Sequence, residues 1–271
     1  MKMLLMADLH IGLPETQFPG QHYEYVPDFV RAYLPTLVAE NADEVIVVGD
    51  LVNRGTPGEF AAARELFAPL ADRMRVIPGN HDLVRATLDD FRGGVPGARV
   101  NEVHDAGPFV QVFLNTAIEK LNPWHWHGEL TADAVAAIDR AIATAAGRPM
   151  LVFAHHPPAE TVRTAEHPMM VLRDSRALMD RLLAYGAPVV LVVGHNHLGD
   201  VWRTRNLTIV SLPSIAFWPH AYVVATFADG VLSFETKRLV NDLSQSPDTT
   251  APDAATRRLR EPTVERIAIR L

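Results

Sequence analysis

Short apolar runs rich in β-branched residues recur along the chain, and several are separated by segments in which apolar residues repeat at helical spacing. In segment 28–39, for example, Phe29, Tyr33, Leu37 and Val38 fall on one face of a helix. The short runs are typical of buried strands. We predict strands at residues 1–7, 44–48, 74–77, 109–114, 150–154, 189–193, 207–212, 222–227 and 231–236, and helices at residues 28–39, 59–70, 131–146 and 175–185.

Strands that alternate with helices predict an α/β core. A hairpin follows it, because Ala228-Asp229-Gly230 joins the last two predicted strands and Asp-Gly is a strong turn signal. We expect one large domain over residues 1–240 and a C-terminal tail over residues 241–271. Within the tail, residues 242–256 have little apolar content and are expected to be mobile. Alternating apolar residues in 263–271 predict a strand that docks back onto the domain or onto a partner.

The chain has 271 residues and no cysteine, which excludes disulfides, thiolate zinc sites and cysteine nucleophiles. Its 25 basic and 32 acidic residues give a net charge of −7, and basic residues gather only at Arg257, Arg258 and Arg260. A chain that grips nucleic-acid backbones usually carries a basic stripe. We therefore expect no long nucleic acid among its partners.

The longest uncharged stretch, residues 206–228, raises the question of a membrane span. Pro213 and Pro219 argue against a spanning helix, and the stretch fits two strands and a loop better. The apolar start of the chain is interrupted by Asp8 and His10, unlike a signal peptide. We expect a soluble, cytoplasmic protein with no membrane partner.

Residue types that can bind metal ions lie immediately after five of the predicted strands. In open α/β sheets, ligands gather at the carboxyl ends of strands, so these residues are expected to meet. One such strand end would be weak evidence, whereas five make a strong pattern. The five segments are Asp8-Leu9-His10, Gly49-Asp50, Gly79-Asn80-His81-Asp82, His155-His156-Pro157-Pro158 and Gly194-His195-Asn196-His197.

The number and type of these donors point to two metal ions. In an extended segment, residues i and i+2 face the same way, so Asp8 with His10, and His195 with His197, are each expected to offer two donors to one small volume. Carboxylate, imidazole and amide donors suit Mn, Fe, Zn or Co, as divalent or trivalent ions. Seven ligands are too many for one tetrahedral zinc and fit two ions that share a carboxylate: Asp8, His10, Asp50, Asn80, His155, His195 and His197.

In this order, the motifs Asp-x-His, Gly-Asp, Gly-Asn-His-Asp, His-x-Pro and Gly-His-x-His resemble those of the calcineurin-like metallophosphoesterases. The resemblance extends from residue 4 to about residue 240. The His155-His156-Pro157-Pro158 run and the later Pro213-Ser214 are similar to the bacterial class III cyclic-nucleotide and glycerophosphodiester phosphodiesterase branch. The resemblance implies a four-layer αββα sandwich of two mixed sheets flanked by helices, with a dinuclear metal site at the strand ends.

The resemblance also implies a role for each motif residue. His81 matches the family's histidine that is not a ligand and lies near the leaving group, and Asp82 would orient it. Asn53 stands where the family often has an acidic residue, a departure that affects tuning of the metal more than the site itself. The two ions would share Asp50, the first being held also by Asp8, His10 and His197, and the second also by Asn80, His155 and His195.

Three residues near the motifs are candidates for substrate contact: His156, His22 in the loop after the first motif, and Trp218 in the loop after Pro213-Ser214. For Trp218, packing in the core or at an interface is the equal alternative. The Trp-His-Trp-His segment at 124–127 is interpreted as a packed loop or strand with inward tryptophans rather than as a substrate wall.

We therefore expect a metal-dependent phosphohydrolase that cleaves small phosphodiesters of the cyclic-nucleotide or glycerophosphodiester type by attack of a hydroxide that bridges the two ions. One alternative is a phosphomonoesterase or nucleotide hydrolase that uses the same site. Another, from a different class, is a scaffold that has lost catalysis, which the complete ligand set disfavours. A homodimer is a compatible assembly.

Overall fold

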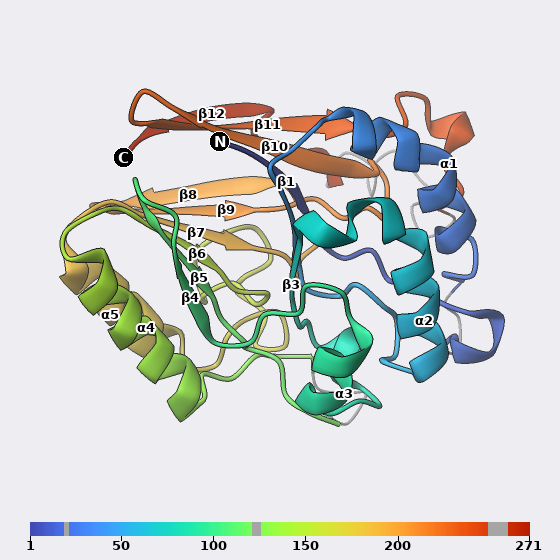
Figure 1. Ribbon diagram of the computed structural model, residues 1–271, viewed down its shortest axis with the longest axis horizontal. Helices are drawn as coiled ribbons and strands as arrows, with labels where there is room; N and C mark the ends of the chain where they lie inside the picture. The colour runs from blue at the N-terminus through green and yellow to red at the C-terminus, as the bar shows by residue number, and fades with distance from the viewer. Residues whose placement is uncertain (19–21, 121–125, 249–259) are drawn as a thin grey trace.

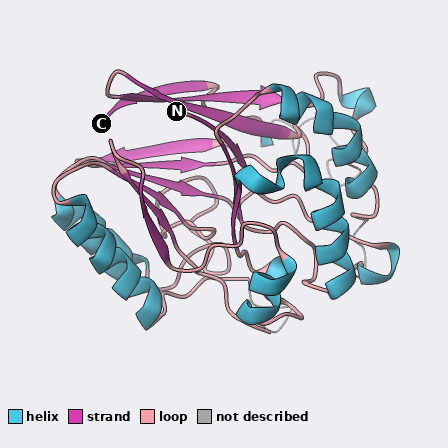
Figure 2. Ribbon diagram, in the orientation of Figure 1, coloured by secondary structure: helices cyan, strands magenta, loops and turns pink. Residues whose placement is uncertain are grey.

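Two mixed β-sheets pack face to face, and helices cover the outer face of each, as Figure 1 and Figure 2 show. The computed structural model describes residues 1–18, 22–120, 126–248 and 260–271. Within these residues each sheet has six strands. The expected four-layer sandwich of two sheets flanked by helices is confirmed.

The first sheet runs in the order β12, β11, β10, β1, β2, β3. Strands β1, β2 and β3 are parallel, whereas β10, β11 and β12 are antiparallel to their neighbours. Helices α1, α2 and α3 share an apolar cluster with the outer face of this sheet. The elements are β1 Lys2–Met6, β2 Glu44–Val48, β3 Met74–Ile77, β10 Ala221–Ala228, β11 Val231–Arg238, β12 Arg266–Arg270, α1 Val26–Ala39, α2 Pro57–Leu66 and α3 Leu88–Gly94.

The second sheet runs in the order β4, β5, β6, β7, β9, β8. Its four inner strands are parallel, and the edge strands β4 and β8 are antiparallel to their neighbours. Helices α4 and α5 cover its outer face. The elements are β4 Glu102–Asp105, β5 Val110–Phe113, β6 Met150–Phe153, β7 Val189–Val193, β8 Asp200–Thr204, β9 Leu207–Ser211, α4 Ala132–Ala145 and α5 Ser175–Tyr185, with short 3₁₀ turns at Pro14–Thr16, Ala68–Arg73, His81–Leu83 and Leu243–Gln245.

Strand β1 illustrates how the apolar runs build the core. Leu4 and Met6 pack under the outer helices, whereas Met3 and Leu5 face the second sheet. All four side chains are fully buried, so each contributes about 1.5–3 kcal/mol to folding. A strand buried on both faces has a continuous apolar sequence, which is why this pattern predicted it.

The pattern missed three elements, β4, β8 and α3. The two strands lie at sheet edges and carry polar, partly exposed side chains, so they have no apolar run. Helix α3 begins at a capping box in which the Thr87 side chain accepts from the Asp90 backbone and the Asp90 carboxylate accepts from the Thr87 backbone. The helix predicted at 59–70 begins and ends earlier, as α2, and a 3₁₀ turn follows it.

The C-terminal tail returns to the first sheet. The segment expected to dock contains β12, which pairs antiparallel with β11 at the sheet edge. Of the segment expected to be mobile, residues 249–256 lie outside the described residues. Asp248, just before them, is buried and accepts a hydrogen bond from the backbone of Trp218.

The uncharged stretch at 206–228 forms β9, β10 and the loop between them, as predicted. The longest described helices, α1 and α4, have 14 residues each, whereas a helical span needs about 20. Among the residues that the structure describes, no helix is long and apolar enough to cross a bilayer.

Candidate metal centre

The loops that follow β1, β2, β3, β6 and β7 converge, as the strand-end pattern predicted. The loops after β1 and β2 stay paired, since the backbone N–H groups of Leu9 and His10 donate to the carbonyl of Asp50. The two sheets meet where the ring of His155 lies 2.9 Å from the carbonyl of Val48. The carboxyl ends of both parallel strand sets therefore open onto one site.

The backbone is left-handed at five of the seven candidate ligands. Our expectation that Asp8–His10 and His195–His197 are extended is therefore wrong, although each pair does converge. Left-handed residues cost about 1–2 kcal/mol each and persist where the surroundings hold them. For His195 the support is a backbone N–H that lies 3.1 Å from both carboxylate oxygens of Asp8. The φ angles are +54° at Asp8, +49° at His10, +51° at Asp50, +70° at His195 and +59° at His197.

Asp8, His10 and His197 form a first donor group, with ligand atoms within 4.8 Å of one another. The Nε2 atoms of His10 and His197 are 3.2 Å apart, and Nε2 of His197 is 3.5 Å from Oδ1 of Asp8. Two imidazole nitrogens that face each other this closely need a proton or a cation between them. The group thus attracts positive charge.

A second donor group contains Asp50, Asn80, His155 and His195. Nε2 of His155 lies 3.2 Å from Oδ2 of Asp50 and 3.2 Å from Oδ1 of Asn80. The rings of His155 and His195 are 5.1 Å apart. Oδ2 of Asp50 is also 3.9 Å from Nε2 of His10 in the first group. Asp50 therefore stands between the two groups, where a bridging carboxylate belongs.

Main-chain carbonyls fix the tautomers of the second group. Nδ1 of His155 contacts the carbonyl of Val48 at 2.9 Å, and Nε2 of His195 contacts the carbonyl of Met169 at 3.3 Å. Because a carbonyl only accepts, these nitrogens carry the hydrogens, and the other nitrogen of each ring offers its lone pair. Histidines that bind metal ions show this arrangement.

Burial and neighbouring charges set the protonation of the site. Burial, with His81 nearby, holds the pKa of His10 well below its usual value. Burial and His155 lower the pKa of His195 to about 3. Burial tends to raise the pKa of Asp50, but the nearby His155 and His81 outweigh it and keep that pKa well below the ordinary range. Burial also tends to lower the pKa of His155, but the nearby Asp50 carboxylate outweighs it and raises that pKa to about 9. A metal ion binds neutral imidazoles and ionised carboxylates, so binding at His155 releases a proton.

His81 and Asp82 have separate positions in the loop after β3. Nδ1 of His81 lies 2.8 Å from the carbonyl of Asn53, so Nδ1 carries the hydrogen and Nε2 is the nitrogen that can exchange a proton. The buried carboxylate of Asp82 accepts from the backbone of Val52 at 2.9 Å and of Gly79 at 2.8 Å. Neither of these bonds runs to the His81 ring, and the implied role of Asp82 in orienting His81 stays a prediction. The Asn53 carbonyl orients the ring, and Asp82 ties the loops after β2 and β3 together.

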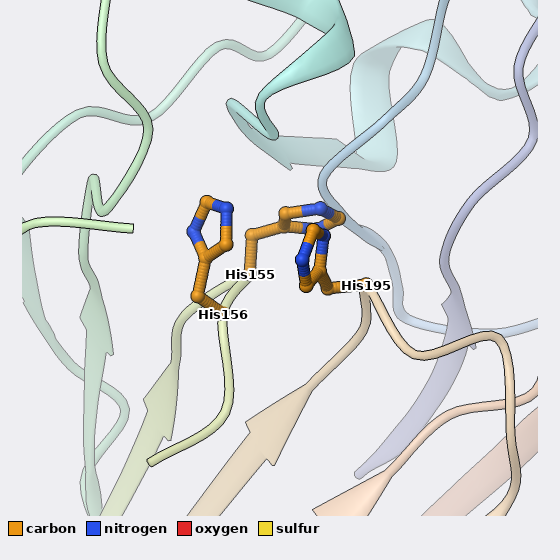
Figure 3. Close-up of side chains that lie close together, drawn as sticks. All are labelled: His155, His156 and His195. Atoms are coloured by element: carbon orange, nitrogen blue, oxygen red, sulfur yellow. The ribbon is translucent and has the colours of Figure 1, made fainter. Parts of the chain in front are cut away.

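His156 belongs to the interior beside the second group. Figure 3 shows the rings of His155, His156 and His195 close together, and the centre of the His156 ring lies 4.8 Å from that of His155 and 4.5 Å from that of His195. Nε2 of His156 lies 2.9 Å from the carbonyl of Trp126, and Nδ1 lies 2.8 Å from Oγ1 of Thr116. Both nitrogens are used within the protein, and the side chain is fully buried. This placement gives no support to the expected substrate contact.

The other two candidates for substrate contact lie in different settings. His22 is an exposed residue whose Nδ1 is 3.5 Å from the Glu24 carboxylate. Trp218 is buried, its backbone N–H donates to Asp248 at 3.0 Å, and its indole N–H donates to Glu261 at 3.2 Å. Packing, the alternative considered for Trp218, is what the structure shows.

Segment 124–127 is only partly described, since Trp124 and His125 lie outside the described residues. His127 is buried, and its Nε2 is 3.6 Å from the Glu129 carboxylate. Trp126 is 45% exposed, so the expected inward packing is wrong for this tryptophan. Its side chain faces solvent while its carbonyl accepts from His156.

The donors present fit metal ions. The facing Nε2 atoms of His10 and His197 call for a cation between them. The second group has the outer hydrogen bonds of metal ligands. Nitrogen and oxygen donors without thiolate suit the ions expected from the sequence.

Several groups that hold the ligands were not predicted from the sequence. Phe217 stacks on His197, with ring centroids 4.6 Å apart and planes at 26°. The carbonyls of Val48, Asn53 and Met169 orient three histidines. A carbonyl is present at every residue, so no sequence signal could have singled these out.

The family comparison identifies a match over most of the chain. Residues 1–199 match the family model described as calcineurin-like phosphoesterase. This range contains all seven candidate ligands and His81. It ends just after the last motif, so the described strands β8 to β12 lie at or beyond its end.

Relatives in sequence carry the names of phosphodiesterases. "Glycerophosphodiester phosphodiesterase GpdQ" of Enterobacter lignolyticus (strain SCF1) is 30% identical over 183 residues, which are 65% of this chain and 63% of that protein. "3',5'-cyclic adenosine monophosphate phosphodiesterase CpdA" of Pseudomonas aeruginosa is 29% identical over 198 residues, which are 73% of this chain and 66% of that protein. The chain thus spans just under two thirds of the length of these relatives.

Similar solved structures share the architecture. A dimetal phosphatase from Danio rerio superposes with a TM-score of 0.69 at 15% identity, covering 90% of this chain and 98% of that one. Purple acid phosphatase PPD1 from yellow lupin gives 0.57 at 14% identity, covering 100% of this chain and 53% of that one. At such identities the likeness shows the fold alone, and it agrees with the two-sheet sandwich.

Proposed function

Because this chain belongs to the calcineurin-like phosphoesterase family, we propose that it is a metal-dependent hydrolase of small phosphodiesters. The observation that carries the proposal is the convergence of strand-end donors into two groups that meet at Asp50. The names of the relatives, a glycerophosphodiester phosphodiesterase and a cyclic adenosine monophosphate phosphodiesterase, support the diester class.

Two metal ions would divide the donors between them and share Asp50. When bound, such a pair supplies charge neutralisation at the phosphoryl oxygens and activation of water. The ligands of the first ion would be Asp8, His10, Asp50 and His197, and those of the second Asp50, Asn80, His155 and His195.

His81 is the residue proposed to handle the proton of the leaving group. The Asn53 carbonyl holds the hydrogen of Nδ1, so Nε2 is the atom that gives a proton to the departing oxygen. Asp82 stabilises this arrangement. Its buried carboxylate accepts hydrogen bonds from the backbone of Val52 and Gly79, which belong to the loops that carry Asp50 and His81. Tyr23 stacks on His10 and Phe217 stacks on His197, so aromatic rings line that side of the first group.

The experiment compares hydrolysis of bis(p-nitrophenyl) phosphate and p-nitrophenyl phosphate with Mn²⁺ supplied. We expect faster cleavage of the diester, and a loss of about 100-fold or more with fewer bound ions in Asp50→Asn. The matched control is Asp180→Asn, an exposed aspartate on α5. Unchanged activity and metal content in Asp50→Asn would contradict the proposal. Faster cleavage of the monoester would instead assign a phosphomonoesterase or nucleotide hydrolase at the same donors.

The identity of the ions stays a prediction, with Mn, Fe, Zn and Co as candidates. Metal analysis of the purified protein tests it. A screen of cyclic nucleotides and glycerophosphodiesters tests the substrate class. The expected cytoplasmic location and the homodimer also stay predictions.

A further inference from the structure

The two donor groups are held by different kinds of contact. In the second group, carbonyls hold the outer nitrogens of His155 and His195. In the first group, the hydrogen bonds and ion pairs found for the rings of His10 and His197 among the described residues run only to other residues of the site. Instead, aromatic rings pack against them: Tyr23 on His10 at 5.2 Å and 27°, and Phe217 on His197 at 4.6 Å and 26°. The orientation of the first group therefore depends on where these rings lie.

The ring of His197 is the least enclosed of these histidines: its side chain is 29% exposed, whereas those of His10 and His155 are almost fully buried. Its orientation therefore depends most on the ring that packs against it. Phe217 also contacts the ring of His10 at 5.8 Å and that of Tyr23 at 5.5 Å. One phenylalanine thus borders both histidines of the first group. A shift of Phe217 therefore changes the packing around the rings of both His10 and His197.

Phe217 lies in the loop between β9 and β10, and the C-terminal part of the chain fastens this loop. We refer to residues 246–248 and 260–263 as the C-terminal strap. The Asp248 carboxylate accepts from the backbone N–H of Trp218 at 3.0 Å and from the Arg260 guanidinium at 2.6 Å. The guanidinium carbon of Arg260 lies 5.1 Å from the centre of the Phe217 ring. The ion pair therefore holds Trp218 on one side and covers Phe217 on the other.

The strap also binds the loop that carries His197. The backbone N–H of Thr263 donates to the carbonyl of Gly199 at 3.0 Å. The Arg163 side chain donates to the carbonyls of Gly199 at 2.7 Å and Glu261 at 2.9 Å, and so joins the strap to this loop. Pro262 packs so closely on Gly199 that a Cβ there would lie 3.0 Å from the proline Cβ. The strap thus links the loop of His197 to the loop of Phe217.

The ion pair is well placed for this task, because the side chains of Asp248 and Arg260 are only 1% and 19% exposed. A buried pair keeps its geometry, since removing one partner leaves a buried charge without compensation. Both residues lie beyond the family match at residues 1–199. The ion pair is therefore a feature of this chain that lies outside the range matched by the family.

We propose that Asp248 and Arg260 are positioning residues for the first metal ion, acting through Phe217 on His197. The inference rests on the proposed function, since it assumes that the first donor group binds a metal ion. It differs from a general stabilising role because it affects one metal site and leaves the carbonyl-held site unchanged.

The test uses the full chain, freed of metal by a chelator and titrated with Mn²⁺ by calorimetry. The wild type is expected to bind two ions. In Arg260→Ala and in Phe217→Leu, we expect binding at one site to weaken about tenfold, the scale on which outer contacts of metal ligands act, while the other site is unchanged. Arg260→Lys restores much of the loss. The control, Arg266→Ala, removes an exposed arginine of β12 and leaves both sites unchanged.

Enzyme kinetics supply a second readout. In Arg260→Ala, we expect kcat/KM for bis(p-nitrophenyl) phosphate to fall about tenfold at limiting Mn²⁺ and to recover at saturating Mn²⁺. Unchanged affinity at both sites in Arg260→Ala and Phe217→Leu would overturn the inference, as would equal weakening of both sites. A raised KM with normal Mn²⁺ binding would also overturn it and make Arg260 a substrate contact. A wild type that binds none of Mn²⁺, Fe²⁺, Zn²⁺ and Co²⁺ would defeat the proposed function itself.

Discussion

Replacing Gly49 by alanine tests how far the second metal site depends on the hydrogen bond behind His155. Gly49 has φ +82°, and a Cβ there would lie 2.3 Å from Nδ1 and 2.6 Å from Cγ of His155. No real Cβ approaches a ring so closely, so the imidazole has to move. It then loses the carbonyl of Val48, to which Nδ1 donates over 2.9 Å.

Two contributions set the expected loss of stability in Gly49→Ala. The left-handed backbone costs about 1–2 kcal/mol once a Cβ is present. A buried carbonyl left without its donor costs about 1–3 kcal/mol more. The free energy of unfolding is therefore expected to fall by about 2–5 kcal/mol. Because the lost contact fixes a ligand, Mn²⁺ binding at one site is expected to weaken about 10- to 100-fold.

Gly186→Ala is the matched control, because Gly186 has the same φ of +82° and no atom lies within 4 Å of its added Cβ. It carries only the backbone cost, so we expect a loss of about 1–2 kcal/mol and normal metal binding. Urea unfolding of the metal-free proteins measures the stabilities, and calorimetric titration measures Mn²⁺ affinity. Equal Mn²⁺ affinity in the two alanine variants would refute the reasoning.

Three further outcomes are expected. His81→Ala should lower kcat about 100-fold or more on diesters with an alkyl leaving group and less on nitrophenyl esters, which leave without a proton; equal losses on both, with Mn²⁺ binding intact, would remove His81 from that role. Chelation should abolish hydrolysis and lower the Tm, and Mn²⁺ should restore both; retained activity in a metal-free sample would contradict the site. At Glu40, burial tends to raise the pKa, but hydrogen bonds from Lys2, Lys237 and Tyr222 lower it from 4.5 to about 2. The stabilisation is thus complete above pH 4.5 and is lost as the pH falls toward 2. Since the lysines are about one third exposed, screening reduces it to about 1–2 kcal/mol. Urea unfolding of wild type and Glu40→Gln at pH 6 and pH 2.5 checks this, and a difference that does not shrink at the lower pH would count against it.

The sequence alone predicted the strands whose apolar side chains are buried on both faces. The edge strands β4 and β8 were not predicted, because half-exposed strands contain polar residues that also occur in loops. Helix α3 escaped because it is short, and its signal was the capping box at Thr87 and Asp90.

The sequence also placed the candidate ligands at strand ends, because parallel strands bring their carboxyl ends to one edge. The sequence did not predict the local backbone conformation at these ligands. An extended Asp8–His10 segment was the natural expectation from strand periodicity, but left-handed residues turn the chain there. That conformation is imposed by contacts such as the bond from the His195 backbone to Asp8, which joins residues 187 positions apart.

What orients the ligands was decided only by the tertiary structure. The carbonyl of Asn53 is the hydrogen-bond partner of the His81 ring, and no sequence pattern distinguishes one carbonyl from another. The stacking of Phe217 on His197, and the strap that holds it through Asp248 and Arg260, join parts of the chain that lie outside the motifs. Sequence patterns report which residues can bind a metal ion, whereas the contacts that aim them form only when distant segments pack together.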